Sequence, residues 1–134
     1  MKERLEQDVR FWARILRLED WDIEVEVISA DRMAVEMGEK TQAYIERDRV
    51  RKCAIIKVKE GGTELDHDLV HEIVHILMDE FQAKALLAID LIESATAREA
   101  LQREVRESLE RTINQIVRAL LSLAAVEAKK EQPA

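Results

Sequence analysis

The sequence predicts an α+β fold in which a helix, a small three-stranded sheet and further helices follow one another along the chain. Strand-like segments, with short apolar stretches or period-two alternation, lie within residues 21–59, whereas the flanking segments repeat apolar residues at helical spacing. The 134 residues contain only three glycines and one proline, so few positions interrupt a helix. We therefore expect a single domain over residues 1–134, with residues 129–134 as a frayed tail.

The first half of the chain should form one helix and the whole sheet. Residues 1–18 place their apolar side chains on one helical face. Residues 21–29 alternate between apolar and acidic residues, which predicts a half-buried strand with one wet face. Residues 30–38 predict a short helical turn. Strands at 41–48 and 52–59 are joined by a basic link that suits a hairpin, so we expect a mainly antiparallel sheet.

The second half of the chain is expected to be helical. Thr63 or Asp66 can cap a helix that runs to about Ala83. A helix or a helical bend should cover residues 84–94, and a long helix should span about 96–128.

The charge of the chain restricts its partners. The formal net charge is −7 and 37% of the residues are charged, so the surface should repel nucleic acid and anionic membranes. No apolar run approaches the roughly 20 residues that span a bilayer. The charged N-terminal segment does not resemble a signal peptide. We therefore expect a cytoplasmic protein without a nucleic-acid or membrane partner.

One segment carries a recognisable chemical pattern, H-E-x-x-H, formed by His71, Glu72 and His75. Histidines four residues apart lie one above the other on a helix and can share one tetrahedral zinc ion. Glu72 follows the first histidine and can take a proton from a zinc-bound water, whose pKa the metal lowers to about 7. The alternative is a pair of ordinary histidines on a helix face.

A third histidine complicates this assignment. His67, His71 and His75 recur every four residues, and the outer two lie about 12 Å apart along a helix axis, too far to share one ion. His67 could pair with His71, with Asp68 in place of the base. We expect instead that His67 lies near solvent at the start of the helix.

The third zinc ligand should be a carboxylate, because no histidine or cysteine follows His75. The long helix has an apolar stripe that includes Ile113, and about 100° per residue places Glu110 about 60° from Ile113 around the helix. Glu107 lies about 120° away. Glu110 is therefore the first candidate and Glu107 the second.

Two further charged residues could support the site. Arg106 lies about 20° from Ile113 on the same face and could pair with Asp79 or a substrate carboxylate, or reach out to solvent. Asp79 lies one turn beyond His75. It could orient a zinc ligand, or simply lie on the helix surface.

Residues 66–77 and 110–121 together resemble small gluzincin-type metallopeptidases, including the compact minigluzincins and phage-type proteins of similar length. Residues 110–121 are also similar to the glutamate-helix signature of the ImmA/IrrE metallopeptidase family. The resemblance implies a zincin-like fold, with Glu110 as the third ligand and Asn114 supporting the site. Many such enzymes stabilise the oxyanion with an additional side chain, and the remaining candidates here are Tyr44 and Arg106.

These observations predict a zinc-dependent metallopeptidase with one zinc ion per chain, acting on a peptide or protein substrate. The alternative is a catalytically weak or inactive zinc-binding module that acts through protein–protein interaction. The long helix could also form a homodimer interface, although its apolar stripe could equally pack within the monomer.

Overall fold

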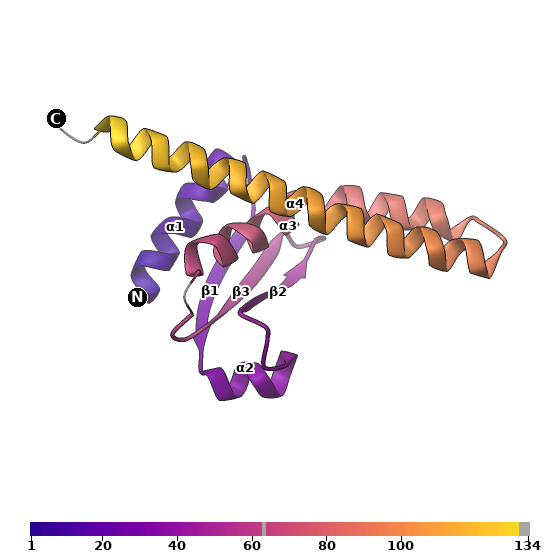
Figure 1. Cartoon of the computed structure of the whole chain (residues 1–134), viewed down its shortest axis with the longest axis horizontal. Helices are drawn as coiled ribbons and strands as arrows, with labels where there is room; N and C mark the ends of the chain where they lie inside the picture. The colour runs from indigo at the N-terminus through magenta and orange to yellow at the C-terminus, as the bar shows by residue number, and fades with distance from the viewer. Residues whose placement is uncertain (63, 132–134) are drawn as a thin grey trace. The chain divides into compact units, whose positions relative to one another are not determined.

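The computed structural model describes residues 1–62 and 64–131, which form four helices and a three-stranded sheet (Figure 1). This confirms the predicted α+β class. The helices are α1 (Lys2–Ile15), α2 (Ala30–Met37), α3 (Leu65–Asp90) and α4 (Ala95–Glu131). The strands are β1 (Asp22–Ile28), β2 (Ala43–Asp48) and β3 (Cys53–Lys59). No helix within the described ranges is long and apolar enough to cross a membrane.

The chain divides into two compact units, Met1–Leu77 and Met78–Ala134. The boundary falls inside α3, so the first unit holds the sheet, α1, α2 and the first half of α3. The second unit holds the rest of α3 and α4. The expectation of a single domain over residues 1–134 stays a prediction.

The sheet is mixed rather than mainly antiparallel. Its strand order is β1-β3-β2, with β3 in the centre. β2 and β3 form the predicted antiparallel hairpin, in which the Asp48 carboxylate accepts hydrogen bonds from the amides of Val50 at 3.0 Å and Arg51 at 3.1 Å. β1 pairs with β3 in parallel. The long connection through α2 and β2 allows this parallel pairing, which a short hairpin does not.

The two faces of the sheet differ in polarity, as the alternation in residues 21–29 predicts. On β3, Ala54, Ile56 and Val58 are buried and face the core of the first unit. The helices contribute further buried residues to this unit: Leu5, Val9 and Trp12 from α1, and Leu69, Val70, Ile73 and Val74 from α3. Cys53, Ile55 and Lys57 point to the opposite face, which we call the outer face.

Polar contacts join helix α2 to strand β1, and Ser29 caps the first turn of the helix. The Ser29 hydroxyl accepts from the Arg32 amide at 3.1 Å, and the Arg32 guanidinium donates to Glu26 of β1 at 2.9 Å. Met33 is 1% exposed and fixes the buried side of the helix. The short helical turn predicted for residues 30–38 is confirmed, and Gly38 ends it with φ 104°.

Two predicted helix boundaries are wrong. α3 does not stop or bend near Ala83 but runs unbroken to Asp90, because residues 84–90 contain neither glycine nor proline and are rich in alanine and leucine. Asp66 is the second residue of α3 rather than its cap, and its carboxylate accepts from Arg4 at 2.8 Å. The other predicted cap, Thr63, lies outside the described residues.

The second unit begins with the last turns of α3, and a short turn over residues 91–94 leads into α4. The Ser94 hydroxyl accepts from the Ala97 amide at 3.3 Å, and Arg98 donates to the Ile92 carbonyl at 2.6 Å. Ile89, Leu109, Ile113 and Val117 are buried. α4 continues through Glu131, where a frayed tail was expected, and residues 132–134 lie outside the described ranges.

Candidate metal centre

The H-E-x-x-H residues lie on the part of α3 that belongs to the first unit. Ile73 and Val74, between the two histidines, are both 0% exposed. Because these apolar side chains fix the rotation of the helix, the polar side chains of the motif are held on a defined side. Glu72 is only 9% exposed, and a carboxylate is rarely so buried unless it is paired or lies near a metal.

The two histidines come together as the motif predicts. Nε2 of His71 lies 3.1 Å from Nε2 of His75, and the ring centroids are 4.8 Å apart. Two nitrogens bound to one zinc ion at about 2.05 Å and a tetrahedral angle lie about 3.3 Å apart. The observed distance therefore suits a shared ion. It also suits a direct hydrogen bond between the rings, in which one Nε2 donates and the other accepts.

His67 is less well placed for metal binding than the other two histidines. Its ring centroid lies 6.2 Å from that of His71, farther than the separation of His71 and His75. Its side chain is 34% exposed, and Nδ1 lies 3.7 Å from an Asp68 carboxylate oxygen. Burial raises the pKa of Asp68, and His67 partly opposes that shift. The geometry therefore favours His71 and His75 over the alternative pair of His67 and His71.

The candidates for the third ligand lie on α4, in the second unit. Glu110 follows the buried Leu109 and is itself exposed, as is Glu107. Within residues 1–62 and 64–131, His71, His75 and Glu110 form a group of ligating side chains that could hold a metal ion. Glu107 does not belong to this group.

The predicted supporting residues of the second unit differ in exposure. Arg106 is exposed, so it reaches solvent from α4, which was one of the outcomes expected for it. Asp79 and Asn114 are half-buried on α3 and α4 respectively. The support that each would give to a metal ligand stays a prediction.

Tyr44, the other candidate for oxyanion stabilisation, is engaged on the outer face of the sheet. Its hydroxyl donates to the Glu36 carboxylate, which also accepts from Arg32 at 2.9 Å. The Lys57 ammonium lies 5.4 Å from the centre of the Tyr44 ring and donates to Glu46 at 3.0 Å. The hydrogen bond to Glu36 raises the pKa of Tyr44.

No pattern in the sequence indicates Glu36 or Lys57 as a partner of Tyr44. The register Tyr44↔Lys57 places these two side chains opposite each other, and α2 brings Glu36 to the Tyr44 hydroxyl. Alternation indicates which face each strand residue occupies, but not which residue lies opposite it. Only the strand register and the position of α2 could have revealed this network.

The network predicts that Glu36 contributes to the free energy of unfolding in a pH-dependent way. The hydrogen bond from Tyr44 lowers the pKa of Glu36 most, and the hydrogen bond from Arg32 lowers it further. Because the folded-state pKa is lowered, the stabilisation is present above the unfolded-state pKa of about 4.3 and disappears as the pH falls through the folded-state value. Glu36→Gln should therefore unfold at lower urea concentration than the wild type at pH 7.

The difference in stability between the two proteins should shrink as the pH falls below the unfolded-state pKa of about 4.3, because the wild type then progressively loses the contribution of the Glu36 carboxylate. Tyr44→Phe is the matched control, since it removes the main donor but not the carboxylate. It should weaken the pH dependence without abolishing it, because Arg32 still donates to Glu36. An equal difference between wild type and Glu36→Gln at pH 3 and pH 7 would contradict the assignment.

Comparisons with family models, curated proteins and solved structures find no match for this chain. The resemblance to gluzincin-type metallopeptidases thus stays a prediction from the two motifs.

Proposed function

We propose that this chain is a zinc-dependent metallopeptidase in which His71, His75 and Glu110 hold the metal and Glu72 is the general base. The observation that carries this proposal is the 3.1 Å separation of the two histidine Nε2 atoms. Two neutral imidazoles and one carboxylate form a ligand set that suits zinc and leaves a fourth position for water or substrate.

The burial of Glu72 supports its role as the base. The residue lies beside the first histidine ligand and is 9% exposed. In a site from which bulk water is largely excluded, a carboxylate exchanges protons with the reacting groups rather than with solvent. A structural zinc site has four protein ligands and needs no base.

Each group has a separate task in this proposal. A divalent metal, when bound, polarises the substrate carbonyl and lowers the pKa of a water molecule. Glu72 accepts the proton of the attacking water and then delivers it to the amine that leaves when the peptide bond breaks. His71 and His75 act as neutral ligands, so protonation of either ring should weaken metal binding as the pH falls.

The contacts of Tyr44 favour a second function, a zinc-binding module that acts through protein–protein interaction. The hydroxyl donates to Glu36 on the outer face of the sheet, so it is not available to an oxyanion in this arrangement. Without such a donor, an acyl-transfer site loses about 10²- to 10³-fold in rate. This alternative keeps the metal ligands but predicts little or no hydrolysis.

Zinc content of the purified protein tests the metal site. The wild type should bind zinc at one ion per chain, and Glu110→Ala should lose most of it, because two histidines alone leave the ligand set incomplete. Glu107→Ala is the matched control. It removes a carboxylate from the same helix and should leave zinc content unchanged.

Two results would contradict the assignment in different ways. Loss of zinc only in Glu107→Ala would move the third ligand to that residue. A wild type that takes up no zinc, even after dialysis against it, would leave the two histidine rings joined by a direct hydrogen bond and exclude the enzyme proposal.

A further inference from the structure

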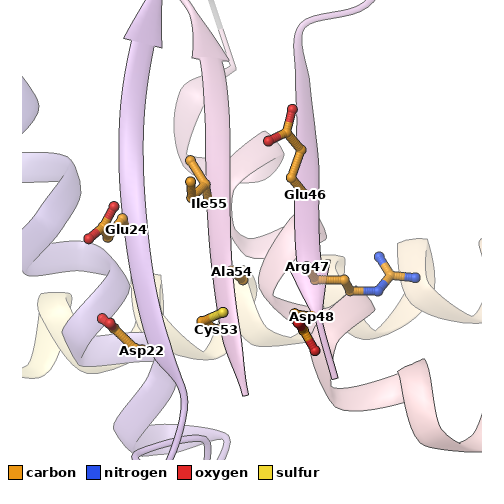
Figure 2. Close-up of a pocket in the computed structure, with 8 residues that line it drawn as sticks. All are labelled: Asp22, Glu24, Glu46, Arg47, Asp48, Cys53, Ala54 and Ile55. Carbon is orange, nitrogen blue, oxygen red and sulfur yellow. The ribbon is translucent and has the colours of Figure 1, made fainter. Parts of the chain in front are cut away.

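The outer face of the sheet is hollowed at the end where β1 and β3 begin and β2 ends. The hollow encloses about 430 Å³. Cys53 and Ile55 of β3 lie along its centre, between Asp22 and Glu24 of β1 and the acidic residues of β2 (Figure 2). An apolar strip thus lies between the two carboxylates of β1 and a β2 row in which Arg47 stands between Glu46 and Asp48.

The carboxylates of the two rows differ in how far their charges are already neutralised. On β2, Glu46 accepts from Lys57 at 3.0 Å, and Asp48 accepts from the amides of the hairpin turn. On β1, neither the Asp22 carboxylate nor the Glu24 carboxylate has a hydrogen-bond or ion-pair partner within the described part of the chain. The β1 row therefore offers two carboxylates to an external cation.

Helix α1 presents a surface of complementary character. Phe11 is 47% exposed and Ile15 is 51% exposed, one turn apart on the same side of the helix. Arg10 and Arg14 form the adjacent stripe and are exposed. Neither guanidinium has an ion-pair partner among residues 1–62 and 64–131. The surface formed by these four side chains, which we call the α1 stripe, is apolar on one side and basic on the other.

The spacings of the two surfaces match. Residues four apart on a helix are separated by about 6 Å along its axis, and residues two apart on a strand by about 6.7 Å. Arg10 and Arg14 can therefore face Asp22 and Glu24 as two pairs. In that arrangement, Phe11 and Ile15 would lie over the apolar strip of β3.

We propose that the hollow on the outer face is a docking site for the α1 stripe of a second copy of this chain. Charge complementarity selects this occupant, because two unpaired cations meet two unpaired anions while the exposed aromatic ring enters an apolar strip. The contact is heterologous: each copy offers its α1 stripe to one neighbour and its hollow to another. Such contacts produce rings or open chains rather than a two-fold dimer.

This assembly is distinct from the dimer predicted through the long helix, and it does not depend on the zinc site. The interface is small and partly electrostatic, so we expect weak association that strengthens with protein concentration and weakens with added salt. The average mass of wild-type protein should rise measurably between roughly 10 μM and 1 mM, the range in which such interfaces bind.

Charge reversal on each surface separately tests the proposal by analytical ultracentrifugation. Asp22→Lys with Glu24→Lys should reduce self-association at least about tenfold, as should Arg10→Glu with Arg14→Glu. When the two double variants are mixed, the intact α1 stripe of the first can dock on the intact hollow of the second. The two reversed surfaces, now acidic on α1 and basic in the hollow, are also complementary in charge, so the mixture should regain the association that each variant alone has lost.

Glu39→Lys with Glu60→Lys is the matched control for the first variant. It makes the same change in net charge at exposed carboxylates outside the hollow and should leave association unchanged. A wild type that stays monomeric throughout the concentration range would overturn the proposal. So would association that survives both reversals, which would point to the long helix. Thermal unfolding of each variant verifies that it is folded, and zinc content should not change.

Discussion

Glu72→Gln should lower the rate of peptide hydrolysis by about 10²- to 10⁴-fold while the chain still binds zinc. Glutamine has nearly the shape of glutamate, so the 9% exposed position should accept it without a cavity. Its amide cannot take up a proton from water at neutral pH. The two histidines keep their places on α3, so metal affinity should change little.

The measurement compares cleavage of a mixed peptide library by wild type and variant, with zinc content determined on the same samples. Glu80→Gln is the matched control, because Glu80 lies on the same helix with a 74% exposed side chain. It should cleave as the wild type does. Equal cleavage by Glu72→Gln and wild type would exclude Glu72 as the base. No cleavage by the wild type, with zinc bound, would favour the protein-binding module.

The parts of the fold that depend on local sequence were predictable. Alternation in residues 21–29 indicated a strand with one wet face, and the structure places Asp22 and Glu24 exposed and Val25 buried there. The hairpin followed from two strands with a short basic link. In each case a period of two or a short connection determines the structure without reference to the rest of the chain.

Strand pairing and helix length were harder to predict. Nothing in the sequence of β1 specifies that it pairs in parallel with β3, because the partner is chosen by packing of the whole unit. The bend expected near Ala83 was inferred without a glycine or proline to cause it. α3 instead stays helical to Asp90, as its alanine and leucine residues favour.

The candidate site, too, has a part that local sequence predicts and a part that it does not. The approach of His71 and His75 follows from helix geometry alone, since i and i+4 side chains share a face in any α-helix. The angle between Glu110 and the apolar stripe of the long helix predicts which face Glu110 occupies. It does not predict which residues lie opposite that face. The engagement of Tyr44 by Glu36 required the position of α2, which no local pattern contains.

His75→Ala should abolish the stabilisation of the fold by zinc. A ligand that binds only the folded state adds RT ln(1 + [L]/Kd) to the free energy of unfolding, about 4 kcal/mol when free zinc exceeds Kd a thousandfold. The wild type should therefore unfold at higher temperature with zinc than with a chelator. The variant keeps one histidine of the pair and should unfold at the same temperature in both conditions, as followed by circular dichroism.

His67→Ala separates the two histidine pairings that the repeat of three allows. With the rings of His71 and His75 at 4.8 Å and those of His67 and His71 at 6.2 Å, removal of His67 should leave the zinc effect intact. If instead His67→Ala lost the effect and His75→Ala retained it, the metal would lie between His67 and His71. Asp68 would then take the place of Glu72. Loss of the effect in both variants would contradict a single zinc ion bound by one pair, because three histidines spread over about 12 Å cannot bind one tetrahedral ion. The pair of variants therefore decides where on α3 the chemistry is located.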